Sequence, residues 1–375
     1  MLDVVQLENP DSLVVLSFGE DSPMMEEEPE HPRRLATIQT IENLTPIEGA
    51  DFIECAQVLG WYLVTKKGEF KIGDPCVFFE IDSLLPDEPV FEFMRNRGFR
   101  VKTVKFKRQI SQGLALPMDA FKWGLPLFGE DQYPNMGDDV TEHLGVKKWE
   151  PKGGAKILAA HAKGNFPAFL RKTDEERIQN CFKAVSPHFD HQWEAREKLD
   201  GSSVTYYMKD GEFGVCSRNL DLKLEGGENQ AATPMVQWAR DNYMAGKMAL
   251  IGGNFALQGE IVGPGIQKNK YGLEKHEVYF FNYFDIEVHQ WGHPHQLGGI
   301  LEDMGLKECP YIDTFRLVNI TVSALVAFAT RKSLLNPKIE MEGIVCRPVE
   351  GFNIDRHGRA SFKVLNPKFL LKYDE

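Results

Sequence analysis

A lysine that stands between two carboxylates, just ahead of a tight turn, constrains this chain more than any other feature. Residues 197–203 read Glu-Lys-Leu-Asp-Gly-Ser-Ser, which places Lys198 beside Glu197 and Asp200. Lysine has an ordinary pKa of about 10.4, so it is a poor nucleophile at neutral pH, and nearby carboxylates raise that pKa further. If Lys198 reacts, a metal ion or a second cation must lie close to it. The fold has to bring that group to the turn from elsewhere in the chain.

The net charge of −12 at pH 7 is concentrated at one end of the chain. Residues 1–32 hold nine of the 55 acidic residues and no lysine or arginine, so the remaining chain has 46 acidic and 43 basic residues. A local basic surface, and not the total charge, decides whether a protein binds a polyanion. The acidity therefore does not exclude a nucleic-acid partner. Residues 1–32 are interpreted as an acidic N-terminal extension, either a solvated linker or an arm that competes with nucleic acid.

The length and composition indicate an ordinary globular protein. The 375 residues, 42% of them hydrophobic, suffice for about two or three domains with sizeable cores. No run of about 18 apolar residues and no signal-peptide pattern occurs, so no membrane partner is expected. The six cysteines lie far apart without a Cys-x-x-Cys motif, which indicates reduced thiols in a cytoplasmic protein. A monomer is expected.

Residues 33–120 are predicted to form a small β domain. Their short strand-like runs, separated by turn residues, are typical of a small barrel of the oligonucleotide-binding kind (OB-like). Residues 100–108 alternate cations with apolar or neutral side chains, which predicts a strand with one buried and one positive face. That face is expected to bind nucleic acid; the alternative is a charged edge that blocks aggregation. The predicted nucleic-acid contacts are Arg100, Lys102, Lys105, Lys107 and Arg108.

A linker and a larger second domain are predicted to follow. Residues 121–165 are rich in glycine and proline, which indicates an interdomain linker. Residues 166–375 alternate strand and helix signals, so the fold class is α+β with a mostly antiparallel sheet. A helix is expected near the start of this domain, with Thr173 as its N-cap and acidic residues in its first turn.

An ordered set of charged motifs marks the ends of the predicted strands in the second domain. No P-loop, dinucleotide fingerprint or Gly-x-Ser-x-Gly motif occurs. Each motif of the set is weak by itself, because a carboxylate or lysine at a strand end is usually a surface residue. The set comprises Lys-x-Asp-Gly at Lys198, Ser-Arg at Arg218, Gly-Glu at Glu260, Phe-Asp at Phe284, Glu-Gly-Ile-Val at Glu342 and Phe-Lys at Lys363.

Taken in this order, the set resembles the motif series of the covalent nucleotidyltransferases, the superfamily of ATP-dependent DNA and RNA ligases and mRNA capping enzymes. The resemblance runs from about Lys172 to Lys372. Residues 172–180, 197–198 and 258–267 look most like RNA ligases. In one RNA ligase branch an OB-like domain precedes the catalytic domain, as here. Only about ten residues follow residue 365, so no second barrel is expected after it.

The resemblance implies how the nucleotide would be held in an adenylyltransferase domain over residues 166–375. Lys198 would be the nucleophile that becomes lysyl-AMP. Glu197 would contact the adenine edge, and Arg218 the ribose or a phosphate. Phe284 would stack on the base, with Phe281 as the alternative.

It also implies a metal site and a phosphate contact. Asp200, Glu260 and Glu342 would hold Mg²⁺ or Mn²⁺, and Glu260 would also lie beside the ribose. Lys363 would neutralise the α-phosphate. The family often has Lys-x-Lys at this point, whereas this chain has leucine at position 365. Either one lysine suffices, or Lys368 takes the second role.

The function implied by the resemblance is that of an ATP-dependent RNA ligase in RNA repair. It would join a 3′-OH to a 5′-phosphate, in RNA or in a nicked duplex with an RNA 3′-OH, through lysyl-AMP and a 5′-adenylylated polynucleotide. One alternative is a DNA ligase or a GTP-using capping enzyme, in which the barrel normally follows the catalytic domain. Another is a non-catalytic nucleic-acid-binding protein on a ligase scaffold, against which the intact lysines and carboxylates argue.

Overall fold

The computed structural model describes residues 33–123, 133–150, 160–225, 232–355 and 358–373. Residues 35–375 form one compact unit. The predicted acidic extension, residues 1–32, lies outside the described residues. In the part of the chain that is described, no helix is long and apolar enough to cross a membrane.

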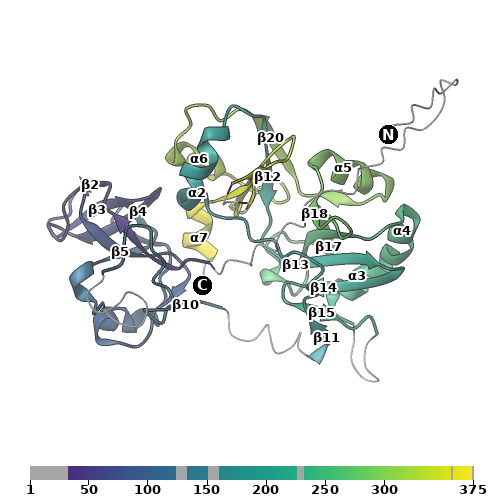
Figure 1. Ribbon diagram of the computed structural model, residues 1–375, viewed down its shortest axis with the longest axis horizontal. Coiled ribbons are helices and arrows are strands. Elements are labelled where there is room, and N and C mark those ends of the chain that lie inside the picture. The colour runs from purple at the N-terminus through teal and green to yellow at the C-terminus, as the bar shows by residue number, and fades with distance from the viewer. Residues whose placement is uncertain (1–32, 124–132, 151–159, 226–231, 356–357, 374–375) are drawn as a thin grey trace, which may run out of the picture. The chain divides into compact units, whose positions relative to one another are not determined.

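Short antiparallel strands build the first domain, as its turn-rich sequence predicts (Figure 1). One sheet has the strand order β1-β5-β9, a second has the order β2-β3-β4, and two further pairs are β6-β10 and β7-β8. The bounds are β1 Ala36–Thr40, β2 Asn43–Pro46, β3 Ile53–Val58, β4 Trp61–Lys66, β5 Pro75–Phe79, β6 Ser83–Leu84, η1 Pro89–Arg97, β7 Val104–Phe106, β8 Gln109–Ser111, β9 Leu114–Pro117, η2 Met118–Ala120 and β10 Lys147–Lys148.

The first domain continues into the predicted linker. Val140 and Val146 are buried in the same core cluster as Leu35. Strand β10 pairs with β6, which fixes the end of this segment to the domain. Residues 133–150 therefore pack with the first domain, and Gly137 and Gly145 lie in turns where their positive φ favours glycine.

A large antiparallel sheet forms one half of the second domain (Figure 1). Its order is β11-β15-β14-β13-β16-β17-β18, and β19 pairs in parallel with β17. The strands are β11 Ala162–Asn165, β13 Ser202–Lys209, β14 Glu212–Ser217, β15 Leu220–Leu222, β16 Phe255–Val262, β17 Glu277–Asp285, β18 Gln290–Trp291 and β19 Lys307–Glu308, and the helices that pack on them are α3 Pro234–Asp241, α4 Met244–Ile251 and α5 Pro294–Asp303.

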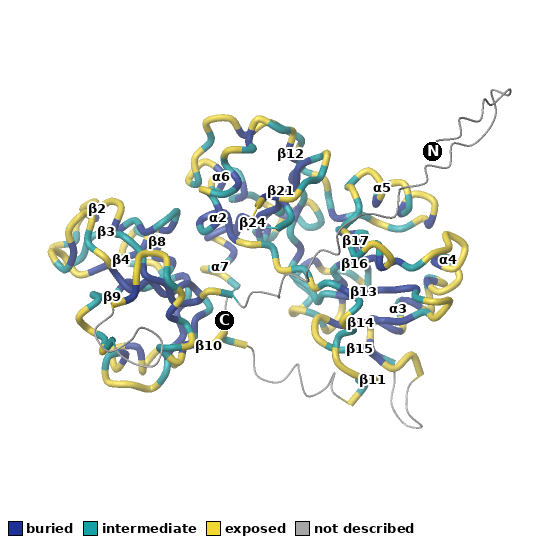
Figure 2. The backbone as a smooth tube through the Cα atoms, viewed as in Figure 1, coloured by how far each residue is buried: buried dark blue, intermediate teal, exposed yellow. Residues whose placement is uncertain are grey.

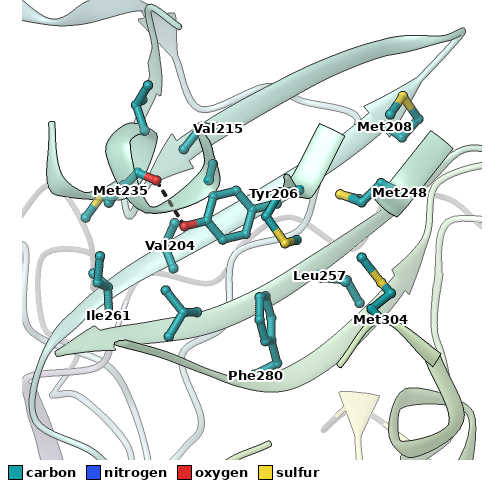
Figure 3. Close-up of a cluster of buried hydrophobic side chains, with 14 of the residues drawn as sticks. Val204, Tyr206, Met208, Val215, Met235, Met248, Leu257, Ile261, Phe280 and Met304 are labelled. Atoms are coloured by element: carbon teal, nitrogen blue, oxygen red, sulfur yellow. Dashed lines mark hydrogen bonds between the residues drawn. The ribbon is translucent and has the colours of Figure 1, made fainter. Parts of the chain in front are cut away.

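The core of this half lies between the sheet and those helices (Figure 3). Val204 and Tyr206 of β13 alternate toward it, the pattern of a strand with one face covered by helices. Tyr206 is fully buried, and its hydroxyl donates a hydrogen bond of 3.1 Å to the carbonyl of Met235 in α3. The central strands are buried over most of their length (Figure 2), so the opposite face of the sheet is also covered.

A smaller sheet forms the other half of the second domain, with the order β20-β12-β21-β24. Helices α2 and α6 pack on it around Trp193 and Ile344. The elements are α2 Ile178–Val185, η3 Ser186–His188, β12 Trp193–Lys198, η4 Gln267–Asn269, β20 Tyr311–Phe315, α6 Val322–Ala329, β21 Gly343–Pro348, β22 Asn353–Ile354, β23 Gly358–Arg359, β24 Phe362–Leu365 and α7 Pro367–Tyr373. The predicted α+β class with antiparallel sheets is confirmed.

Thr173 does not cap a helix. Helix α2 begins five residues later, at Ile178, and its N-cap residue is Arg177. The Thr173 hydroxyl instead donates to the side chain of Gln258 in the large sheet. A tertiary hydrogen bond has taken the place of the local one that the sequence pattern indicated.

Candidate active site

Lys198 is the last residue of β12, where the two sheets of the second domain meet. It lies opposite Gly343 in the pairing of β12 with β21. This register places Glu342, the residue just before β21, beside the lysine, and Lys198 Nζ donates to Glu342 Oε1 at 2.6 Å. A Cβ on Gly343 would collide with the backbone of Val364 in β24, so the close strand approach at this point requires glycine.

The turn after Lys198 is fixed to the large sheet. The amide of Gly201 donates to Glu260 Oε1 at 3.0 Å. A Cβ on Gly201 would collide with the carbonyl of Ile261 in β16, so this turn also needs glycine. The turn and two strands, β16 and β21, thus bring three predicted carboxylates to Lys198: Asp200, Glu260 and Glu342.

The charges in this group shift one another's pKa values. Burial raises the pKa of Glu260 to about 8, although Lys198 acts to lower it. Burial also raises the pKa of Glu342, against the same lysine. For Lys198, burial acts to lower the pKa, but the three carboxylates together raise it above its usual value. The lysine is therefore a charged ammonium in this arrangement, and added positive charge is needed to make it a nucleophile.

The carboxylates fit a divalent cation. Glu342 Oε2 is buried and accepts no hydrogen bond, which leaves a desolvated anionic oxygen available to an added cation. Mg²⁺ and Mn²⁺ prefer carboxylate and water ligands. In the described residues, no group of three or more His, Cys, Asp or Glu side chains is arranged to hold an ion directly.

Glu197 has an open acceptor position on the other side of the strand. Its side chain is only 2% exposed, and Oε2 accepts a hydrogen bond from the amide of Leu334 at 2.8 Å. The second oxygen, Oε1, is buried without a hydrogen-bond partner. Burial raises the pKa of this carboxyl group. An unsatisfied buried acceptor of this kind suits a ligand that donates a hydrogen bond, such as an exocyclic amine.

The structure separates the two phenylalanines predicted as base-stacking partners. Phe284 is fully buried and its ring contacts Trp291 at 4.9 Å between centroids, so neither face is open to a ligand. Phe281 is only half-buried and packs with the cluster that contains Leu199, the residue next to Lys198. A β-bulge in the pairing of β16 with β17 shifts the alternation of side chains at this point. Phe281, and not Phe284, therefore packs in the cluster that contains Leu199, the residue after Lys198.

Lys363 and Arg218 both pair with Asp174, a carboxylate that was not predicted as a site residue from the sequence. Lys363 Nζ lies 2.8 Å from Asp174 Oδ1, and Arg218 Nη2 lies 3.1 Å from Asp174 Oδ2. Burial lowers the pKa of Lys363 to about 8, assisted by the charges of Arg177 and Lys198. Asp174 belongs to the segment that resembles RNA ligases, but its partners are 44 and 189 residues away. Only the fold shows that they meet.

Two more predicted positions have different surroundings. Asp200 is paired with Lys270, a residue that the sequence reasoning did not single out. Lys270 could have been considered from the sequence because it lies three residues after Gln267, the last residue of the segment that resembles RNA ligases. Lys368, the alternative second lysine, is exposed on α7.

The predicted basic strand of the first domain is a short hairpin. Residues 104–106 and 109–111 pair as β7 and β8, with the turn between them. Lys105, Lys107 and Arg108 are exposed there, and Lys102 is half-buried. Arg100 is different: it is 6% exposed, lies 3.5 Å from the centroid of the Trp149 ring and pairs with an aspartate. Arg100 is a buried structural cation and does not present its charge on the surface.

Two family models match the chain. A model described as an OB-fold domain matches residues 35–118, and a model described as RNA ligase matches residues 191–365. No curated protein sequence matches the chain. The first model covers the domain of short strands, and the second covers the chain from just before β12 to the end of β24.

Solved structures of an RNA ligase from Naegleria gruberi are similar to this chain over most of its length. A variant of that ligase with ATP and Mn is 36% identical, with a TM-score of 0.80 and coverage of 92% of this chain and 100% of that chain. The ligase with PPi is 36% identical, with a TM-score of 0.78 and coverage of 90% and 98%. Another variant, with AMP and Mn, is 36% identical, with a TM-score of 0.79 and coverage of 90% and 98%. The chain therefore belongs to the RNA ligase family.

Proposed function

We propose that this protein is an ATP-dependent RNA ligase that joins a 3′-OH to a 5′-phosphate. The observation that carries the proposal is the convergence of Lys198 with three carboxylates and Lys363 in a chain of the RNA ligase family. The reaction proceeds by adenylation of the lysine, transfer of AMP to the RNA 5′-phosphate, and attack by the 3′-OH. RNA and ATP are its partners.

In the first step, Lys198 Nζ attacks the α-phosphorus of ATP. A phosphorus–nitrogen bond forms, the bond to the oxygen that bridges to the β-phosphorus breaks, and pyrophosphate leaves. Lys198 must first lose a proton to solvent; its pairing with Glu342 opposes this loss, and added positive charge beside the pair favours it. The approach of the nucleophile and the stabilisation of phosphate charge are the main work of the protein in such a transfer.

The carboxylates of Asp200, Glu260 and Glu342 would hold a divalent cation, in part through water. When bound, Mg²⁺ or Mn²⁺ supplies positive charge that favours the neutral amine and offsets charge on the phosphates. Lys363 adds to that positive field; burial, with a smaller contribution from the charges of Arg177 and Lys198, lowers its pKa. ATP phosphates would displace Asp174 as the anionic partner of Lys363 and Arg218.

The base and the RNA contact further residues. Glu197 Oε1 accepts a hydrogen bond from the adenine amine, and the ring of Phe281 stacks on the base. Lys102, Lys105, Lys107 and Arg108 bind the RNA phosphates from the hairpin of the first domain. A nicked duplex with an RNA 3′-OH is the proposed substrate.

The domain division and the setting of the enzyme are part of the same proposal. An OB-like domain extends from residue 33 to about residue 150, and an adenylyltransferase domain follows from about residue 166. The six cysteines are buried free thiols, which suits a reducing compartment such as the cytoplasm. The protein acts as a monomer in RNA repair.

Labelling with α-labelled nucleotides tests the function directly. Incubated with Mg²⁺ or Mn²⁺, the protein is expected to retain label from ATP after denaturation, because the bond between Lys198 and AMP is covalent. The Lys198→Ala variant is expected to retain none, while melting within a few degrees of the unchanged protein. Label from GTP alone would instead indicate a capping enzyme, and no label from either nucleotide would refute the enzyme.

A further inference from the structure

Lys270 is a largely buried cation that pairs with Asp200, one of the three carboxylates around Lys198, and the proposed reaction gives it no role. Its Nζ forms a salt bridge with Asp200 Oδ2, and the two side chains are 12% and 17% exposed. Burying two charges at such low exposure is unfavourable unless their geometry is well fixed. The surroundings of Lys270 therefore decide what the pair does.

Helix α7 supplies two aromatic rings to this lysine. Lys270 Nζ lies 5.2 Å from the ring centroid of Phe369 and 5.3 Å from that of Tyr373. Both distances are within the range in which a cation is attracted to an aromatic face. Phe369 is itself buried. The ammonium is thus held by one carboxylate and two rings, which restricts the position of the charge more than a surface salt bridge would.

The backbone that carries Lys270 is in an unusual conformation. Gln267, Lys268 and Asn269 all have positive φ, at 45°, 58° and 47°, a run that residues with side chains rarely adopt. Side-chain hydrogen bonds stabilise this turn: Gln267 Nε2 donates to the carbonyl of Gly201 at 3.3 Å, and Asn336 Nδ2 donates to the carbonyl of Lys270 at 3.2 Å. Such strain persists where the surroundings fix it, often at a functional site.

The next residue also contacts Asp200. The hydroxyl of Tyr271 accepts a hydrogen bond of 2.8 Å from the Asp200 amide. Lys270 and Tyr271 therefore hold both the side chain and the backbone of this aspartate from one turn. Asn366, the residue just before α7, contacts the backbone of another site residue, since its amide donates to the main-chain carbonyl of Glu342 at 2.8 Å.

We propose that Lys270 is a positioning residue that fixes the Asp200 carboxylate beside Lys198, and that α7 holds Lys270 in place through Phe369 and Tyr373. The inference rests on the proposed function, in which Asp200 serves a divalent cation. Lys270 keeps the carboxylate oriented, and its charge opposes binding of the cation until ATP phosphates arrive. Helix α7 follows β24 directly, so the helix that holds Lys270 is joined to the strand that carries Lys363.

The test uses the full chain with Lys270→Met. Binding of Mn²⁺ without ATP, followed from the electron paramagnetic resonance signal of free Mn²⁺, is expected to tighten by about threefold to tenfold, because a positive charge next to the site is lost. Single-turnover adenylation of Lys198 at saturating Mn²⁺ is expected to slow by about tenfold, with a KM for ATP within about twofold. Tighter metal binding with slower chemistry is a combination that general destabilisation does not produce.

Three further variants separate positioning from folding. Lys270→Arg keeps the charge and is expected to restore Mn²⁺ affinity. Tyr373→Leu keeps apolar volume but removes one ring, so it should shift both readings in the same direction as Lys270→Met by a smaller factor. Lys275→Met removes an exposed charge five residues away, outside the strained turn, and should leave both unchanged, because solvent screens it.

The results distinguish this inference from the proposed function. If the unchanged protein incorporates no label, the function fails whatever the variants do. If the unchanged protein is adenylated, and Lys270→Met has the same Mn²⁺ affinity and the same adenylation rate as the unchanged protein, the positioning role is refuted. Loss of both Mn²⁺ binding and adenylation together with a lower melting temperature would also refute it, because Lys270 would then be only structural. If Lys270→Met does not fold, Tyr373→Leu decides by the same criteria.

Discussion

At the scale of single residues, the lysines of the site are paired with carboxylates in the protein without substrate. Lys198 pairs with Glu342, Lys363 with Asp174 and Lys270 with Asp200. The pairs keep buried charges compensated, which is needed because an unpaired buried charge is strongly unfavourable. In the proposed reaction, ATP phosphates would replace Asp174 as the partner of Lys363, and a divalent cation would replace Lys198 as the partner of Glu342.

Two phenylalanines of β17 give a prediction at this scale. Phe281→Ala removes a half-buried ring beside Leu199, and the KM for ATP in self-adenylation is expected to rise by about threefold to tenfold, the worth of one stacking contact. Phe284→Ala opens a cavity at a fully buried position and should lower the free energy of unfolding by about 3–5 kcal/mol. Steady-state labelling and denaturant unfolding measure the two effects. A rise in KM only for Phe284→Ala would reverse the assignment.

At the scale of elements, the hairpin of β7 and β8 brings several exposed cations together in a protein whose net charge is negative. A turn between two three-residue strands presents Lys107 and Arg108 to solvent, next to Lys105 on β7. Close spacing of cations on one small element suits a polyphosphate backbone, for which the local field matters more than net charge. The buried Arg100, in contrast, stabilises the domain that carries the hairpin.

Replacing Lys105, Lys107 and Arg108 together with alanine should weaken sealing of nicked RNA and spare self-adenylation. Each lost phosphate contact is expected to reduce the slope of log affinity against log salt by about one. RNA binding at several salt concentrations, measured beside adenylation, tests this. Arg100→Ala is the matched comparison, and it should lower the melting temperature of the protein. Equal loss of adenylation and sealing in the triple variant would contradict the role of the hairpin.

At the scale of the whole molecule, contacts between the first and second domains include buried charge. Arg177, just before α2, donates to Asp82 Oδ2 at 2.8 Å and to the carbonyl of Ile81 at 3.3 Å. Trp61 of β4 donates to Asn180 of α2 at 2.7 Å. Arg177 also bridges to the backbone of Lys363, so the same residue contacts both the first domain and a strand of the active site.

Arg177→Met should destabilise the protein by about 3–5 kcal/mol, because the buried Glu80 carboxylate loses an ion-pair partner and Asp82 loses one of its cations. Arg95→Met provides a control: Arg95 pairs with Asp87 at 50% side-chain exposure, and its loss should leave stability nearly unchanged, because solvent screens the pair. Urea unfolding of both variants, beside the unchanged protein, measures the difference. Equal stability of the two variants would show that the buried pairs add nothing.

The sequence by itself determined the family, the α+β class, the order of the two domains and Lys198 as the candidate nucleophile. Lys198, Glu260 and Glu342 could be found because each lies in a short motif whose neighbours, such as Gly201 and Gly343, are needed for close strand approach. Such short motifs can be recognised from the sequence alone, because all their residues are neighbours in the chain. The resemblance to the nucleotidyltransferase motif series then indicated that these residues act together on a nucleotide.

Only the tertiary structure decided which charges meet and which rings face the site. A β-bulge accompanies the packing of Phe281 and not Phe284 against the Leu199 cluster, Asp174 joins cations from distant parts of the chain, and Arg100 is buried against an indole. The physical reason is the same each time: pairing register, burial and charge compensation depend on residues far apart in the chain. Lys270 is the clearest example, since its contacts come from a strained turn and a helix about one hundred residues later.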